Sequence, residues 1–282
     1  MDRELPLVKY ESLTWSIGLY EECMKEQWDP VQYAKFEKER QQPFFDLMAL
    51  IKPYPHMRVV DLGCGDGILT KLLHDRLQAD YILGVDSSPA MLLKAQEVYL
   101  PAVEFQLADI EDLGLERQFD LVLSNAALQW VYGHVSLLGR LAKMLKPRGQ
   151  LAIQMPANRD FVTHVIAREL AEEPPFNESL SGISNPFQNL LSLEEYAQLL
   201  DSLGFKSPLI RLQVYLHRLE STLSVLEWVK GSLLTYYRSH LSPFLYEQFL
   251  QEYKKRLLDA IGDKSPFLFP MKRIFIWGEL AN

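Results

Sequence analysis

The sequence predicts an α/β fold built on a doubly wound, mostly parallel β-sheet. Short apolar segments alternate with helical segments from residue 58 to residue 155. Such alternation is typical of a parallel sheet that is covered by helices on both faces. With 282 residues, 48% of them hydrophobic, the chain can bury a full core in one large domain, so a disordered chain is excluded.

Seven strands can be placed along the chain. They are expected at residues 58–62, 81–86, 103–107, 119–124, 150–155, 208–219 and 272–277. Helices are expected between the early strands, at 68–77, 89–98 and 135–145. Asp29 and Pro30 form an N-cap followed by proline, which predicts a helix that Pro43 interrupts, with a second helix at 44–51.

Helical segments surround the last strands. Residues 161–172 are expected to be helical, 173–188 to be a loop, and 221–261 to be mostly helical with a break near Ser242. A capping box at Ser192 predicts the start of another helix, which ends at Gly204. We expect an N-terminal arm, 1–28, and one domain, 29–282, with helical insertions at about 158–204 and 220–265.

The segment VVDLGCGDGILTKLL, residues 59–73, joins a strand to a helix through three glycines. A dinucleotide fingerprint needs its third glycine at the sixth position, which here is Ile68 or Thr70. A phosphate-binding loop needs Gly-Lys-Ser or Gly-Lys-Thr at its end, and this segment lacks it. The glycines still allow a ligand to approach the backbone. The loop therefore predicts a ligand that is not held through phosphates.

Acidic residues follow the next two strands. Asp86 ends the second strand, where a carboxylate can accept hydrogen bonds from a ribose diol. Asp109 follows the third strand, where it can lie near an adenine or cap a helix. These acids would repel phosphates, so ribose, adenine and an ammonium or sulfonium group suit this crevice.

The motifs DLGCGDG, GVDSSPAML, ADIEDL and SNAALQW, in this order, resemble those of the class I S-adenosylmethionine-dependent methyltransferases. The resemblance implies a Rossmann-like sheet of seven strands, mostly parallel with the last strand antiparallel, and a helical lid insertion. It also implies S-adenosyl-L-methionine as the cofactor. The cofactor-binding residues carried over are Asp61, Gly63, Gly65, Asp86, Ser87, Met91, Asp109, Ile110 and Asn125.

A closer resemblance, to the trans-aconitate methyltransferase family, rests on WDPVQYAKFEKERQQP, SNAALQW, LAIQMPANRD and FPMKRIFI. It implies O-methylation of a small-molecule carboxylate substrate. A carboxyl group with a pKa near ~4 is already ionised at neutral pH, so no general base is required. Alternative acceptors are an acyl carboxylate on a carrier protein, as in biotin-pathway relatives, and another small metabolite. An inactive cofactor-binding regulator is the non-enzyme alternative.

Several residues are candidates for positioning the substrate. Tyr33 and Arg40 share a helix face, where Arg40 can hold the cofactor carboxylate and Tyr33 can reach the methyl group, or the face is simply amphipathic. Gln129 and Trp130 follow the fourth strand, where Trp130 contacts substrate or packs. In the lid region, Tyr237 and Arg238 suit a carboxylate. Alternatively, the tyrosine belongs to the core face of an amphipathic helix and the arginine is exposed.

Composition excludes other classes of function. The net charge of −8 argues against nucleic-acid binding, and pairs such as Lys272 and Arg273 are expected to be solvated strand ends. Two cysteines provide no metal-ligand spacing, so no metal is expected. The N-terminus lacks a signal-peptide core and no apolar run suits a membrane span, so we expect a cytoplasmic protein without a membrane partner.

Overall fold

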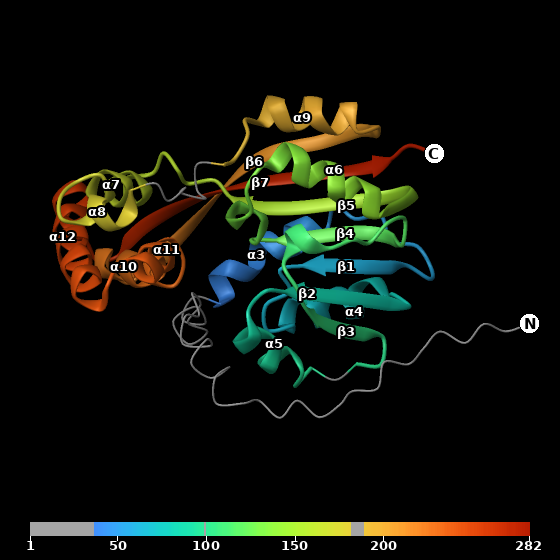
Figure 1. The fold of residues 1–282 in the computed structure, drawn as a ribbon, viewed down its shortest axis with the longest axis horizontal. Helices are drawn as coiled ribbons and strands as arrows, with labels where there is room; N and C mark the ends of the chain where they lie inside the picture. The colour runs from blue at the N-terminus through green and yellow to red at the C-terminus, as the bar shows by residue number, and fades with distance from the viewer. Residues whose placement is uncertain (1–36, 99, 182–188) are drawn as a thin grey trace, which may run out of the picture.

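The computed structural model describes residues 37–98, 100–181 and 189–282, in which seven strands form one sheet (Figure 1). The strand order is β3-β2-β1-β4-β5-β7-β6. The strands are β1 (Arg58–Leu62), β2 (Tyr81–Asp86), β3 (Val103–Leu107), β4 (Phe119–Asn125), β5 (Leu145–Pro156), β6 (Phe205–Leu219) and β7 (Phe267–Leu280). β7 is antiparallel to both neighbours, and the other pairs are parallel. The predicted fold class is confirmed.

Helices connect and cover these strands. They are α3 (Glu37–Met48), α4 (Ile68–Leu77), α5 (Pro89–Ala95), α6 (His134–Met144), α7 (Val162–Ala171), α8 (Phe176–Leu180), α9 (Leu193–Ser202), α10 (Thr222–Lys230), α11 (Leu233–His240) and α12 (Pro243–Ile261). Two short 3-10 helices, η2 (Ile110–Asp112) and η3 (Leu128–Trp130), follow β3 and β4.

Each face of the sheet has its own apolar core. On one face, residues of α6 and α9 such as Leu141 and Tyr196 pack with Ile274 and Ile276 of β7. On the other face, α3 and α4 pack against the sheet, and Phe44 lies in the same core as Phe275 and Trp277. Side chains alternate along a strand, so odd-numbered residues of β7 near Phe275 face α3 and even-numbered ones face α6 and α9.

A cluster of helices lies at one end of the sheet, around the extended ends of β6 and β7 (Figure 1). This helical cluster consists of α7, α8, α10, α11 and α12, with Trp228, Phe249 and Tyr253 buried in its core. Arg256 of α12 binds both carboxylate oxygens of Glu173, at 2.7 and 2.6 Å, and so ties α12 to the chain after α7. α9 packs on the sheet instead.

Capping signals in the sequence are confirmed. Ser88 accepts a hydrogen bond from the Met91 N–H at 3.1 Å, with Pro89 as the first residue of α5. Ser192 and Glu195 form the predicted capping box at the start of α9.

The expected break at Pro43 is wrong. Pro43 lies inside α3, where its ring is buried beside Phe44 and Leu47. A proline inside a helix costs one hydrogen bond and a steric clash, about 3 kcal/mol or more. Burial of this helix face against the sheet offsets that cost.

Other boundaries also differ from expectation. β5 begins at Leu145, which pairs with Phe119 of β4, and so includes the expected turn at 146–149. Lys146 also forms an ion pair of 2.8 Å with Asp120 of β4. β7 continues across Pro270 and pairs with β6 as far as Phe267. The expected loop after residue 173 contains α8, and the last helical region has an extra break between α10 and α11. Among the described residues, no helix is long and apolar enough to cross a membrane.

Candidate functional site

The glycine loop after β1 makes a sharp turn at the carboxyl edge of the sheet. Gly63, Gly65 and Gly67 have φ angles of 77°, 57° and 76°, a left-handed region that favours glycine. A Cβ atom on Gly63 would lie 2.2 Å from the Cβ of Ala127, so this glycine lets the loop pack against the end of β4. A Cβ atom on Gly65 would meet no other atom within 4 Å. The backbone at Gly65 therefore borders open space.

Asp86 links the loop to the end of β2. One carboxylate oxygen accepts the Gly65 N–H at 2.9 Å, and the other accepts the Ser88 N–H at 2.9 Å. A carboxylate offers about four lone-pair sites, so Asp86 can accept a ligand diol in addition to these two donors. Its partly buried position at the edge of the sheet is the one predicted for a ribose-binding acid.

The residues predicted to lie around a base form the rim of this site. Asp109 is exposed and accepts the Glu111 N–H at 2.9 Å, which makes it the cap of η2. The Ala108 N–H donates to the Asp86 carbonyl at 3.1 Å, which keeps these two strand ends adjacent. The other three candidates differ in exposure: Ser87 is exposed, Met91 is buried and Ile110 is partly buried.

Asp61 supports the loop from below. Its carboxylate is 3% exposed and accepts a hydrogen bond of 2.7 Å from the Thr70 hydroxyl on α4. Burial raises the pKa of Asp61 to about 6, although the hydrogen bond from Thr70 opposes this shift. Asp61 is thus a buried anchor between β1 and α4, consistent with its predicted role in orienting the loop.

Two amide oxygens where β4 ends have no protein partner in the described part of the chain. Gln129 donates from Nε2 to the Ala126 carbonyl at 2.7 Å, which orients its Oε1 as an acceptor. Within the described residues, neither this Oε1 nor the Oδ1 of Asn125 has a hydrogen-bond partner, although both are buried atoms. A buried acceptor without a partner is costly, so these oxygens indicate a place for a donor group from a ligand.

The predicted substrate-positioning residues on the lid side, Trp130, Tyr237 and Arg238, lie in different environments. Trp130 is partly buried and packs against the helical cluster. Tyr237 is 1% exposed, and its ring stacks on Phe249 at 4.8 Å inside that cluster. Arg238 is exposed. The structure therefore places Trp130 against the helical cluster at the end of β4, with Tyr237 inside that cluster and Arg238 at its surface.

Two further candidates cannot be placed. Tyr33 lies outside the described residues. Arg40 is in α3, but its side chain falls outside the described part of the chain. The predicted N-terminal arm, 1–28, also lies outside the described residues.

Arg273 corrects the expectation that Lys272 and Arg273 form a solvated strand end. Arg273 is 5% exposed. It lies on β7 two residues before Phe275, and hence on the sheet face that α3 covers. The sequence signal for this placement was the spacing in MKRIFIW. Alternate residues of a strand share a face, so Arg273 lies on the same face as Phe275 and Trp277. Gln154 of β5, which is 1% exposed, was also not among the predicted site residues.

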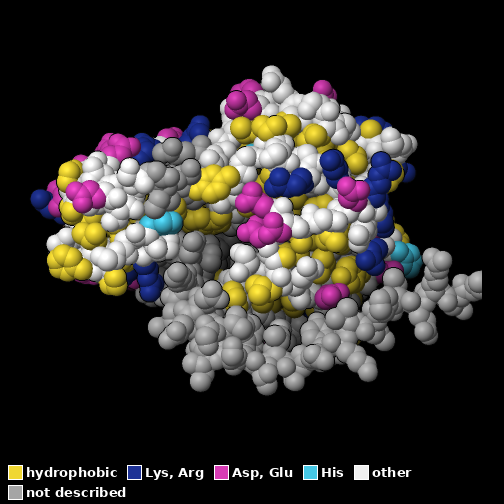
Figure 2. All heavy atoms as spheres, in the orientation of Figure 1, with side chains coloured by type: hydrophobic (Ala, Val, Ile, Leu, Met, Phe, Trp, Pro, Cys, Tyr) yellow, Lys and Arg dark blue, Asp and Glu magenta, His cyan; other side chains and the backbone are white. Residues whose placement is uncertain are grey.

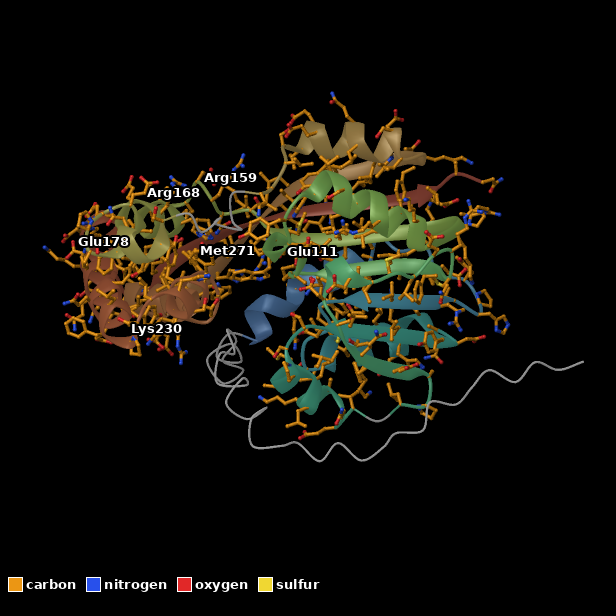
Figure 3. All side chains as sticks on the ribbon, viewed as in Figure 1. Glu111, Arg159, Arg168, Glu178, Lys230 and Met271 are labelled. Atoms are coloured by element: carbon orange, nitrogen blue, oxygen red, sulfur yellow. The ribbon has the colours of Figure 1, made fainter. Side chains whose placement is uncertain are left out.

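The surface is hollowed between the helical cluster and the carboxyl edge of the sheet (Figure 2). Acidic side chains gather on the sheet side of this recess (Figure 2). Figure 3 places Glu111 on that side and Met271 between the sheet and the cluster. Among the described residues, no group of three or more acidic, histidine or cysteine side chains is arranged to hold a metal ion.

Comparisons with known proteins agree with one another. A family model described as a methyltransferase domain matches residues 54–200. Trans-aconitate 2-methyltransferase of Methylobacterium nodulans is 39% identical over 251 residues, 88% of this chain and 96% of that protein. The enzyme of the same name from Acidovorax ebreus is 36% identical over 90% of this chain and 98% of that protein. The enzyme of that name from Deinococcus radiodurans is 40% identical over 82% of this chain and 90% of that protein.

A solved structure supports the fold independently. The YcgJ protein of Bacillus subtilis has a TM-score of 0.58 and 17% identity, over 86% of this chain and 99% of that one. At this identity the likeness concerns the fold alone.

Proposed function

Because this chain belongs to the S-adenosylmethionine-dependent methyltransferases, in the family of the trans-aconitate 2-methyltransferases, we propose that it methylates a carboxylate of a small polycarboxylic acid such as trans-aconitate. The observation that carries the proposal is the similarity to enzymes of that name over 90–98% of their length. The recess between the helical cluster and the sheet would provide a place for the acceptor (Figure 2).

The residues at the carboxyl edge of the sheet fit the cofactor. The open space at Gly65 can accommodate its methionine portion, and Asp86 can accept the ribose hydroxyls. The oxygens of Asn125 and Gln129 can accept the hydrogen bonds of its ammonium group. Asp109 lies beside Asp86, where the adenine would follow the ribose.

The bound cofactor would supply an electrophilic methyl group on a cationic sulfur. The chain's part is then to align the acceptor oxygen with that methyl group. An ionised carboxylate is already a nucleophile, so no residue has to remove a proton. Alignment of two bound reactants can lower the barrier by up to roughly 7–11 kcal/mol.

The contact between the sheet and the helical cluster would keep water from part of the recess. Trp130 provides part of this contact at the end of β4. Exclusion of water strengthens the attraction between the cationic sulfonium and an anionic acceptor. This arrangement favours a small anion over a large acceptor that must remain partly in solvent.

An acceptor screen tests the proposal. The purified chain is incubated with S-adenosylmethionine that carries a radiolabelled methyl group and with single candidate acids. We expect label in trans-aconitate or a related polycarboxylate. Transfer only to a carrier-protein acyl chain or to an uncharged metabolite would replace the proposed substrate. Cofactor binding with no transfer to any of these acceptors would favour the regulator alternative.

A further inference from the structure

Three polar side chains form a row across β4, β5 and β7 on the sheet face that α3 covers. We call Asn125, Gln154 and Arg273 the polar row. Asn125 pairs with Gln154, and Gln154 pairs with Phe275, which lies in the core beneath α3. Directly paired residues share a face, and Arg273 shares the face of Phe275 because it is two residues away.

From this row we infer that Arg273 and Gln154 bind a carboxylate of the acceptor and so determine specificity for polycarboxylates. The inference rests on the proposed function, because it takes the acceptor to be a small polycarboxylic acid. It assigns a role to two residues that lie in motifs of the sequence but were not among its predicted site residues.

Gln154 provides a donor that no described residue of the protein satisfies. Its side chain is 1% exposed, and its Nε2 has no hydrogen-bond partner among the described residues. The backbone carbonyl of Gln154 accepts the Ala126 N–H at 2.9 Å, which fixes this residue beside the loop after β4. A buried amide N–H without a partner costs about 1–3 kcal/mol, a cost that an anionic ligand would remove.

Arg273 brings a positive charge to the same face. Its planar guanidinium can donate two parallel hydrogen bonds to a carboxylate, a geometry that lysine cannot provide. Gln154 and Arg273 are diagonal neighbours on β5 and β7, because Gln154 pairs with Phe275 and Arg273 pairs with Pro156. Diagonal neighbours lie roughly 7–8 Å apart at the backbone, a span that one carboxylate and the long arginine side chain can bridge.

Asp46 of α3 lies over the same face, and it is already hydrogen-bonded. It accepts from the Tyr215 hydroxyl, from Gln213 at 3.0 Å and from Gln42 at 2.9 Å. Burial raises the pKa of Tyr215, and the charges of Arg211 and Arg273 oppose this shift. Arg273 is therefore close enough to this largely buried group to act on it through its charge.

The row also lies next to the place of the reaction. The glycine loop contacts Ala127, because only a glycine at position 63 can approach its Cβ. Gln129 is fixed to the neighbouring Ala126. Acceptor oxygens thus lie on the side of the glycine loop, where an ammonium would bind. The donors of Gln154 and Arg273 lie on β5 and β7, one and two strands beyond β4, where a carboxylate would bind.

The test measures both ligands in variants of the full chain. We expect Arg273→Gln to raise the KM for trans-aconitate roughly 10- to 100-fold, since hydrogen bonds to charged groups are strong. The Kd for S-adenosylmethionine should stay within about twofold of the wild-type value, because the variant loses an interaction with the acceptor and leaves the cofactor site intact. Gln154→Leu should raise the same KM by about fivefold, the loss of one hydrogen bond. Arg273→Lys should fall between wild type and Arg273→Gln.

Arg218→Gln is the matched control, because Arg218 is an exposed arginine on β6. It should leave both constants unchanged. If Arg273→Gln fails to fold, Arg273→Lys and Gln154→Leu provide the same comparison. An unchanged KM in the folded variants overturns the inference. A raised Kd for the cofactor with an unchanged acceptor KM overturns it as well, because the row would then hold the cofactor's own carboxylate.

The outcome can be separated from that of the proposed function. If wild type methylates trans-aconitate and Arg273→Gln does so with the same KM, the inference alone fails. If wild type methylates no polycarboxylate, the proposed function fails. Calorimetry of trans-aconitate with the chain saturated by S-adenosylhomocysteine then decides the inference. Binding that is lost in Arg273→Gln supports it, and absent or equal binding overturns it.

Discussion

The Gly65 backbone N–H donates a hydrogen bond of 2.9 Å to a carboxylate oxygen of Asp86. This bond joins the glycine loop after β1 to the end of β2, so the two parts of the proposed cofactor site are fixed relative to each other. The same carboxylate is the group that we expect to bind the ribose. One side chain therefore shapes the loop and is also the one that we propose to contact the ligand.

Asp86→Ala should raise the Kd for S-adenosylmethionine by about 100-fold or more, because a charged acceptor and a loop contact are lost together. Titration calorimetry measures the Kd, and circular dichroism checks that the fold remains. Asp80→Ala is the control, since Asp80 is an exposed acid beside the other end of β2. Wild-type affinity in a folded Asp86→Ala chain would contradict the assignment of the ribose-binding residue.

The glycines at 63 and 65 should respond differently to alanine. Gly63→Ala creates an overlap with Ala127 and should destabilise the fold by about 1–3 kcal/mol or more. Gly65→Ala meets open space, so it should cost only about 1 kcal/mol of backbone strain while it obstructs the cofactor. Thermal unfolding with and without cofactor separates the two effects. Equal losses of stability and affinity in both variants would argue against a ligand beside Gly65.

Asn125 and Gln129 should contribute to cofactor binding more than to stability. Asn125→Leu removes an acceptor that has no partner among the described residues, so its effect on folding should be small. The Kd for S-adenosylmethionine, measured by titration calorimetry, should rise roughly tenfold, as expected for a hydrogen bond to a charged group.

Asn177→Leu in α8 is the matched control for Asn125→Leu. The Oδ1 of Asn177 is likewise a buried acceptor without a partner among the described residues, but α8 belongs to the helical cluster. This variant should leave the Kd for the cofactor unchanged. Similar effects of the two variants on the Kd would contradict the role proposed for Asn125.

Asp61 should make stability depend on pH. Its pKa is raised from 3.8 to about 6 in the folded chain, so the folded state holds the proton more tightly than the unfolded state. The stability that this carboxyl contributes is therefore present below pH 3.8 and is lost as the pH rises through about 6. Asp61→Asn cannot titrate, and relative to wild type it should gain up to about 3 kcal/mol over this range.

Denaturant unfolding of both chains across this pH range measures the difference. Asparagine can still accept the Thr70 hydrogen bond, so the comparison isolates the ionisation of the carboxyl. Plots of unfolding free energy against pH that run parallel for the two chains would show that burial does not destabilise the ionised form of Asp61.

Local signals in the sequence were sufficient for most of the fold. The strand–helix alternation placed the first five strands, the apolar patterns at 208–219 and 272–277 indicated the last two, and capping residues such as Ser88 and Ser192 placed helix starts correctly. Proline was a reliable signal at a helix start, as at Pro89, but not for a break in a helix. Pro43 lies within α3 and Pro270 within β7, since burial of the neighbouring apolar side chains outweighs the lost hydrogen bonds.

The site could be predicted only where the chain itself brings residues together. The glycine loop and Asp86 follow consecutive strands, so their proximity follows from a parallel sheet. Arg273 could not be placed this way, because its burial depends on the pairing of β7 with β5 and on α3, both distant in sequence. Tyr237 was predicted as a substrate contact or as part of a core face, and its place against Phe249 in the helical cluster depends on tertiary packing that local sequence does not reveal.

The central claim is methyl transfer to a polycarboxylate, and product analysis tests it most directly. The chain is incubated with S-adenosylmethionine and trans-aconitate, and the products are separated and identified by mass spectrometry. We predict a monomethyl ester of trans-aconitate together with an equal amount of S-adenosylhomocysteine. Unchanged trans-aconitate and related polycarboxylates, under conditions where calorimetry shows the cofactor bound, would contradict the claim.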